Sequence, residues 1–234
     1  MSAAMFEPQI FAFPSAGSFG SEFSKLITAV RPNGKVMRYP NRSDTGSVPS
    51  EYSFDTCVDH CVDEIAKKGR KRVVLVGHSF GAYVAFATAG QLIERCEVQP
   101  ALVLSGANAP NEPAPMSEDL STLDEIEAYM RTIDPAVFDR MPDEEWKALT
   151  LELVRQDLNL LAGFRKRPLA KVRCPISIAY GDQDPLVSKA GVAAWKDYTS
   201  STFDAREFAG GHSDLLAGAD FLSWALDTTL TTTA

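Results

Sequence analysis

The chain has 234 residues, a formal net charge of −8, 45% hydrophobic residues and 23% charged residues. This length suits one domain with a large core, and the composition excludes a disordered or fibrous chain. The acidic balance argues against a protein that binds nucleic acid, because such a protein needs a basic surface.

The N-terminus and the cysteines indicate a cytoplasmic protein. Residues 1–7 have no basic segment before an apolar run, so no secretory signal is expected. No apolar run approaches the roughly 18 residues of a membrane-spanning helix. The four cysteines lack the spacing of a metal site, so we expect reduced thiols and no bound metal; they are Cys57, Cys61, Cys96 and Cys174.

Short aliphatic runs alternate with helical patterns along most of the chain. Helices are expected up to about residue 30, at 54–68, up to about residue 94 and at 215–226. Strands are expected at 9–13, 35–39, 73–76, 101–105, 176–180 and 202–208. The alternation predicts right-handed crossovers and an α/β fold with a mainly parallel, doubly wound sheet, whose site lies beyond the carboxyl ends of the strands.

Residues 107–171 interrupt the alternation, because they carry no strand pattern. A proline-rich segment leads into two helical patterns at 117–130 and 143–164. The stretch is far longer than a simple crossover, so we expect a helical lid inserted between two parts of the core, 1–106 and 172–234. Ordinary packing of these helices around the sheet is the alternative.

The third expected strand ends at Gly77-His78-Ser79-Phe80-Gly81, and an alanine-rich helical run follows. A Gly-x-Ser-x-Gly pattern between a strand and a helix is typical of a nucleophile elbow. The two glycines allow a tight turn that holds the Ser79 hydroxyl outward, beside the positive end of the helix dipole. Ser79 is the candidate nucleophile, and a structural serine is the alternative.

The serine hydroxyl needs an imidazole that takes its proton, and the chain contains three histidines. His78 adjoins the nucleophile on the turn, so its side chain should point away from Ser79. His60 lies on the polar side of a helix. His212 follows the last strand in a glycine-rich turn, so it is the expected base.

The base in turn needs a carboxylate that fixes its tautomer. Asp184 follows the fifth expected strand and is the expected acid, whereas Asp182 is interpreted as a turn-forming residue. The order Ser79, Asp184, His212 is the order that accompanies this elbow. The loop after the fourth strand is the other usual place for the acid, but its early residues offer no carboxylate.

The oxyanion formed during acyl transfer needs backbone N–H donors. The residue after the nucleophile, Phe80, is expected to supply one. Ala16, in the small-residue turn after the first strand, is expected to supply the second. The alternative is that this early turn only connects two elements.

With these residues in place, the sequence resembles the α/β-hydrolases, and among them the type II thioesterases of polyketide and nonribosomal peptide assembly lines. The resemblance covers nearly the whole chain and rests on the stretches 13–17, 77–82, 153–161, 181–185 and 210–212. The acidic and hydrophobic stretch around Asp157, leading through residues 168–176, is the part more particular to these thioesterases.

The resemblance implies hydrolysis of acyl groups misloaded or stalled on the phosphopantetheine arm of an acyl or peptidyl carrier protein, through an acyl–Ser79 intermediate. The chain itself would need no cofactor, and a monomer is expected. Basic residues of the lid would suit either docking to an acidic carrier protein or a solvated surface; they are Arg155, Arg165, Lys166 and Arg167. The alternatives are a small-molecule carboxylesterase with the same triad and a noncatalytic ligand binder.

Overall fold

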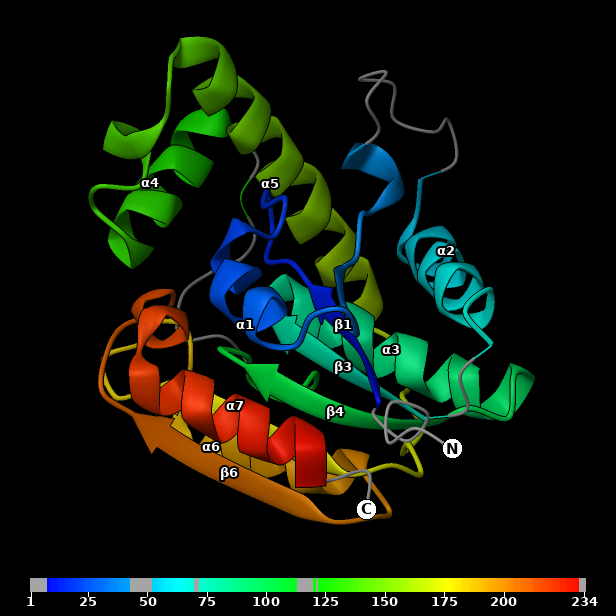
Figure 1. Cartoon of the computed structure of the whole chain (residues 1–234). Coiled ribbons are helices and arrows are strands. Elements are labelled where there is room, and N and C mark those ends of the chain that lie inside the picture. The colour runs from blue at the N-terminus through cyan, green and yellow to red at the C-terminus, as the bar shows by residue number, and fades with distance from the viewer. Residues whose placement is uncertain (1–7, 43–51, 70–71, 113–119, 121, 232–234) are drawn as a thin grey trace.

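The computed structural model describes residues 8–42, 52–69, 72–112, 120 and 122–231. Six strands form one parallel sheet in the order β2-β1-β3-β4-β5-β6 (Figure 1). The strands are β1 (Gln9–Phe13), β2 (Gly34–Val36), β3 (Arg72–His78), β4 (Gln99–Ser105), β5 (Ile176–Gly181) and β6 (Phe203–Phe208). All six expected strands form, and β2 ends earlier than predicted.

Seven α-helices lie in the described part of the chain. They are α1 (Ser24–Ala29), α2 (Phe54–Ala66), α3 (Phe80–Arg95), α4 (Leu123–Ile133), α5 (Glu144–Arg165), α6 (Lys189–Ala193) and α7 (Ala219–Thr231). Short 3-10 helices are η2 (Ser21–Phe23), η3 (Pro40–Arg42), η4 (Phe138–Arg140), η5 (Ala194–Tyr198) and η6 (Asp214–Ala217). Helix α6 and η5 were absent from the sequence prediction. Residues 117–119 and 121 of the helix expected at 117–130 lie outside the described residues.

Alternate side chains of each central strand pack on opposite faces of the sheet. In β3, Val74 and Val76 pack toward α1 and α7, whereas Val73 and Leu75 pack toward α2 and α3. Helices cover both faces in Figure 1. This burial explains why the central strands are nearly continuous apolar runs.

Helix α4, η4 and the first half of α5 lie above the carboxyl ends of the strands, at the upper left of Figure 1. A separate apolar cluster holds them together: Ile126, Tyr129, Phe138, Leu151, Val154, Leu158 and Leu186. The second half of α5 belongs to the core of the sheet, where Phe164 stacks on Phe54 with 4.2 Å between ring centroids. We call α4, η4 and α5 the cover. The lid boundaries at 107–171 stay a prediction.

Candidate active site

Ser79 lies on a strained turn between β3 and α3. Its backbone has φ 54° and ψ −122°, a conformation that few residues other than glycine adopt. The flanking glycines make the turn possible, because a Cβ on Gly77 would lie 2.5 Å from the oxygen of Gly81, and one on Gly81 would lie 2.0 Å from the oxygen of Phe13. The Ser79 N–H donates to the Ser105 carbonyl at 2.9 Å. The chain therefore reverses where β3 ends, as the sequence pattern predicts.

His212 and Asp184 come from the loops after β6 and β5 and meet in a buried contact. His212 Nδ1 lies 2.8 Å from Asp184 Oδ2, and the two residues are 5% and 7% exposed. The other carboxylate oxygen accepts the N–H of Leu186 at 2.9 Å, which fixes the orientation of the acid. A hydrogen bond from Nδ1 to a carboxylate leaves Nε2 as the basic nitrogen of the imidazole.

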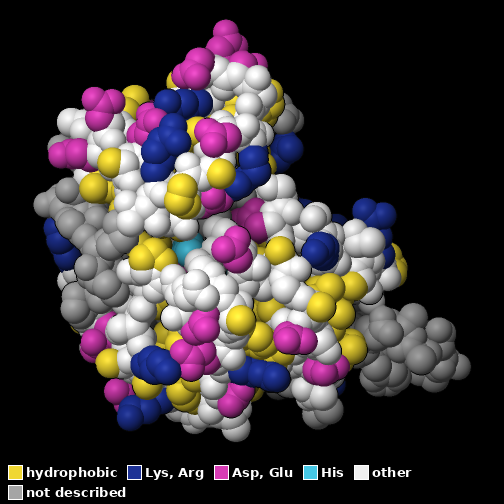
Figure 2. Space-filling model, turned by 90° about the vertical axis from the view of Figure 1, so that its left-hand side faces the viewer, with side chains coloured by type: hydrophobic (Ala, Val, Ile, Leu, Met, Phe, Trp, Pro, Cys, Tyr) yellow, Lys and Arg dark blue, Asp and Glu magenta, His cyan; other side chains and the backbone are white. Residues whose placement is uncertain are grey.

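Ser79 and His212 line the same cavity, which has a volume of about 400 Å³ and lies between the strand ends and the cover. Figure 2 shows this edge of the molecule, where part of a histidine side chain is visible in the hollow below the cover. The loop after β1 forms one wall of the cavity and helices α4 and α5 form another. The structure thus brings the predicted nucleophile and the predicted base to one cavity.

Two backbone N–H groups near Ser79 are available for an oxyanion. Residues 15–18 form the turn after β1, and each of them except Ala16 donates its N–H to an acceptor. In the described part of the chain, the Ala16 N–H has no acceptor. The Phe80 N–H opens α3, so the helix offers it none. Neither of the two predicted oxyanion donors therefore has an acceptor in the described part of the chain, and their role stays a prediction.

His78 is a second imidazole beside the site. It is 1% exposed, its Nδ1 lies 3.0 Å from Ser105 Oγ, and its ring centroid lies 4.7 Å from that of His212. Burial, and then the neighbouring His212, lower the pKa of His78 well below its usual value. His78 therefore contacts Ser105 and His212 as a neutral imidazole.

The buried neutral state of His78 predicts a loss of stability in acid. The unfolded chain takes up a proton at His78 below about pH 6.5, whereas the folded chain does not, so stability falls as the pH falls below that value. In urea unfolding at pH 7.5 and 5.0, the wild type should lose about 2 kcal/mol more than His78→Gln. Equal losses in the two proteins would contradict this reading of His78.

Two further polar side chains hold the loops that carry the acid and the base. Asn108 accepts the Ser188 N–H at 3.0 Å and donates to the Leu186 carbonyl at 3.3 Å, which fixes the segment after Asp184. Asp182 lies in a turn, as predicted, and its carboxylate also accepts the Gly210 N–H at 2.9 Å. Sequence reasoning missed both contacts, because each joins residues of two different loops.

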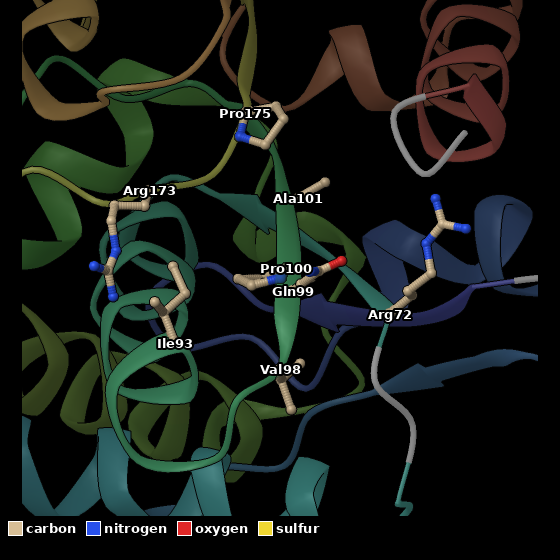
Figure 3. Close-up of a pocket in the computed structure, with 8 residues that line it drawn as sticks. All are labelled: Arg72, Ile93, Val98, Gln99, Pro100, Ala101, Arg173 and Pro175. Atoms are coloured by element: carbon tan, nitrogen blue, oxygen red, sulfur yellow. The ribbon is translucent and has the colours of Figure 1, made fainter.

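A second cavity of about 320 Å³ lies at the amino ends of the strands (Figure 3). It is lined by Arg72, Ile93, Val98, Gln99, Pro100, Ala101, Arg173 and Pro175. None of these residues is a nucleophile, a base or a carboxylate. The cavity beside Ser79 is therefore the candidate active site.

The described ranges contain no group of three or more His, Cys, Asp and Glu residues that could hold a metal ion. No helix within them is long and apolar enough to cross a membrane. The four cysteines are free thiols, and burial raises the pKa of Cys174 to about 12.

The sequence pattern of the thioesterase domain matches residues 8–225. The chain belongs to the thioesterase family. This thioesterase is 32% identical over 213 residues to the thioesterase PikA5 of Streptomyces venezuelae, a match that covers 87% of this chain and 74% of PikA5. It is 26% identical over 208 residues to the "Probable cadicidin biosynthesis thioesterase" of Streptomyces griseus, of which the match covers 57%.

The fold of this thioesterase is shared with solved structures. The type II thioesterase BorB from the borrelidin biosynthetic cluster has a TM-score of 0.82 and 29% identity, with 95% of this chain and 93% of BorB covered. RedJ from the prodiginine pathway has a TM-score of 0.81 at 21% identity and supports the fold alone. The predicted α/β-hydrolase fold is confirmed, and the family makes the protein a hydrolase that acts through an active-site serine.

Proposed function

We propose that this thioesterase removes acyl groups from the phosphopantetheine arm of an acyl or peptidyl carrier protein, as a type II thioesterase. The observation that carries the proposal is the cavity that Ser79 and His212 both line, with Nδ1 of His212 paired to the carboxylate of Asp184. The similarity to PikA5 and to BorB supports the substrate class, because BorB is a type II thioesterase of a biosynthetic cluster.

The first half of the reaction transfers the acyl group to the enzyme. The oxygen of Ser79 attacks the thioester carbonyl while its proton passes to Nε2 of His212. The oxyanion of the tetrahedral intermediate accepts hydrogen bonds from the N–H groups of Ala16 and Phe80. The carbon–sulfur bond then breaks, and the imidazolium returns the proton to the departing thiol of the arm.

The second half releases the acid. His212 takes a proton from a water molecule, whose oxygen attacks the carbonyl of the acyl–Ser79 ester. The second tetrahedral intermediate collapses, the proton returns to the Ser79 oxygen, and a carboxylic acid leaves. Asp184 orients His212 throughout and stabilises its charged form, and no cofactor takes part.

The wall of the cavity suits an acyl chain. The cover and the residues that flank η4 contribute apolar side chains to it, and the acid loop adds one more: Tyr129, Met130, Ile133, Val137, Met141, Val154, Leu158 and Leu186. Such a lining binds a hydrocarbon chain by removing it from water. The cover is therefore proposed to act as the lid that selects the substrate.

The basic residues considered for carrier docking are mostly engaged within the chain. Arg155 pairs with Glu152 at 2.6 Å, and Arg167 pairs with Asp55 at 2.5 Å. Arg165 donates to the backbone carbonyl of Pro110. These contacts favour the solvated-surface interpretation over a dedicated docking face. We propose that the protein acts as a monomer in the cytoplasm.

The test compares one acyl group on two leaving groups. The kcat/KM for the acyl group on a carrier protein is expected to exceed that for its free short-chain ester by about tenfold or more, because only the carrier presents the arm. Equal or faster turnover of the free ester would favour the carboxylesterase alternative. A fluorophosphonate should also label the native enzyme at Ser79, and no labelling would favour a noncatalytic binder.

A further inference from the structure

A buried ion pair joins the cover to the loop that carries Ala16. Arg42, from η3, and Asp157, from α5, have side chains that are 1% and 0% exposed. The guanidinium contacts both carboxylate oxygens, with Nη1 2.9 Å from Oδ1 and Nη2 2.5 Å from Oδ2. The chemistry described above uses neither residue. A fully buried charged pair is costly to desolvate, and this cost is offset only where further hydrogen bonds satisfy both partners.

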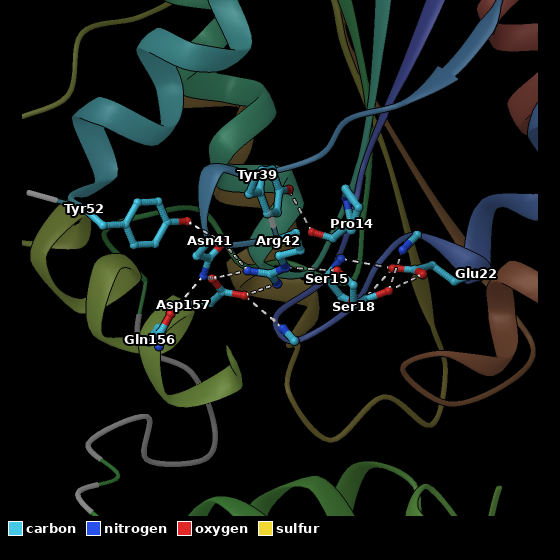
Figure 4. Close-up of polar contacts among 12 residues, drawn as sticks. Pro14, Ser15, Ser18, Glu22, Tyr39, Asn41, Arg42, Tyr52, Gln156 and Asp157 are labelled. Atoms are coloured by element: carbon cyan, nitrogen blue, oxygen red, sulfur yellow. Dashed lines mark hydrogen bonds and ion pairs between the residues drawn. The ribbon is translucent and has the colours of Figure 1, made fainter. Parts of the chain in front are cut away.

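Both members of the pair also hold the turn after β1 (Figure 4). Asp157 Oδ2 accepts the N–H of Gly17 at 2.9 Å, and Arg42 Nε donates to the carbonyl of Ser18 at 3.3 Å. Burial opposes the charge of Arg42, but the hydrogen bond and attraction of Asp157 outweigh it, and the pKa of Arg42 is raised. The two residues after Ala16 are thus tied to a charged pair that solvent does not reach.

Helix α5 also packs directly against this turn. Gly17 has φ +72°, and a Cβ there would lie 2.4 Å from Cγ2 of Val154 and 3.2 Å from the carbonyl oxygen of Thr150. Thr150, Val154 and Asp157 follow one another at helical spacing, so one face of α5 meets the turn. The contact leaves no space for the turn to move toward the helix.

The opposite side of the turn is held by Glu22. One oxygen of Glu22 accepts from the N–H and the hydroxyl of Ser15, both at 3.0 Å, and the other accepts from the hydroxyl of Ser18 at 2.6 Å. The turn therefore lies between two carboxylates. Together they take up the neighbouring N–H groups and leave the N–H of Ala16 for another acceptor.

We propose that Asp157, held in place by Arg42, is a positioning residue for the oxyanion hole. By accepting the Gly17 N–H, its carboxylate fixes the peptide plane between Ala16 and Gly17, which is one of the two planes that meet at the Cα of Ala16. The Ala16 N–H lies in the other plane, between Ser15 and Ala16, so holding the first plane limits how far this N–H can turn away from the reacting carbonyl. Movement of α5 away from the turn would break this hydrogen bond, so the position of the cover and the geometry of the hole change together. The inference rests on the proposed function, in which Ala16 binds the oxyanion.

The test must separate positioning from stability. Asp157→Asn alone would leave the Arg42 charge buried without its partner, which destabilises a fold strongly. Two double variants avoid this problem, because both remove the whole charged pair. Arg42→Met/Asp157→Asn keeps a side-chain oxygen that can accept the Gly17 N–H, whereas Arg42→Met/Asp157→Leu has a side chain of similar size with no acceptor.

The expected difference lies in kcat. At a temperature where circular dichroism shows both variants folded, the Leu variant should have a kcat about 10- to 100-fold below that of the Asn variant, with a similar KM, on the carrier-bound acyl group and on the free ester. The inhibition constant of an alkylboronic acid, whose adduct with Ser79 carries a tetrahedral oxyanion, should weaken in parallel.

Equal kcat values and equal boronate inhibition in the two folded variants would overturn the proposal. A higher KM for the Leu variant with an unchanged kcat would also overturn the proposal, since that pattern indicates a change in substrate binding. The free ester separates a failure of this inference from a failure of the proposed function. A wild type that hydrolyses the free ester but leaves the carrier-bound acyl group intact would contradict the carrier assignment. The ratio of kcat between the Asn and Leu variants on the free ester would still test the role of Asp157.

Discussion

Replacing Ser79 with alanine is expected to lower kcat on a carrier-bound acyl group by about 10⁵-fold or more. Without the hydroxyl there is no acyl–enzyme intermediate, and only substrate binding and the oxyanion donors remain to help water attack. The measurement is release of the carrier thiol, followed with a thiol-reactive dye. Substrate binding should change little, because the other residues that line the cavity are unchanged.

The control for this variant is Ser177→Ala. Ser177 is a buried serine of β5 that does not line the cavity, and its removal should leave kcat within about threefold of the wild type, as expected for a change away from a reacting group. A Ser79→Ala enzyme that keeps more than a tenth of wild-type kcat would contradict the assignment of the nucleophile.

Replacing His212 with glutamine is expected to cost nearly as much, about 10⁵-fold in kcat, because no other described imidazole lines the cavity and Ser79 loses its base. Labelling of Ser79 by a fluorophosphonate should slow along with turnover. Asp184→Asn should cost less, roughly 10⁴-fold, because the imidazole remains but its Nδ1 loses the carboxylate that sets the tautomer.

His60→Gln is the matched control for the base. His60 lies on α2, where its Nε2 is 3.1 Å from the carbonyl of Arg38, and it does not line the cavity. Its kcat and labelling rate should equal those of the wild type. Normal labelling of Ser79 in His212→Gln would show that another group takes the proton of the serine, and would contradict the role given to His212.

Local sequence patterns were sufficient to predict most of this site. The apolar run of β3, the two glycines and the alanine-rich start of α3 lie together in the chain, so they predict the elbow and Ser79 directly. The parallel sheet then places the loops that carry Asp184 and His212 at the same edge. Their 2.8 Å contact follows from topology, although 28 residues separate them.

Contacts between distant segments could not be predicted in the same way. Arg42 and Asp157 are 115 residues apart, and neither lies in a pattern that indicates a partner. The sequence stretch around Asp157 pointed to the family and gave no physical role for the carboxylate. Helix α6 was missed because it has five residues, too few for an amphipathic period to be recognised.

The cover shows a further limit of periodicity. The spacing of apolar residues predicts the helix at 143–164, and α5 forms there as Glu144–Arg165. Periodicity does not say that Phe164 packs in the core of the sheet while Leu151 and Val154 pack in the separate apolar cluster with residues of α4 and η4. Only the three-dimensional structure shows that one helix belongs to both.

The most direct test of the central claim is the intact mass of an acylated carrier protein before and after incubation with the enzyme. With the wild type, the carrier should lose the mass of the acyl group and keep its phosphopantetheine arm. With Ser79→Ala, the acylated mass should persist over the same time. Persistence of the acyl group with the wild type, or its loss at equal rates with both enzymes, would contradict a serine thioesterase that acts on carrier-bound acyl groups.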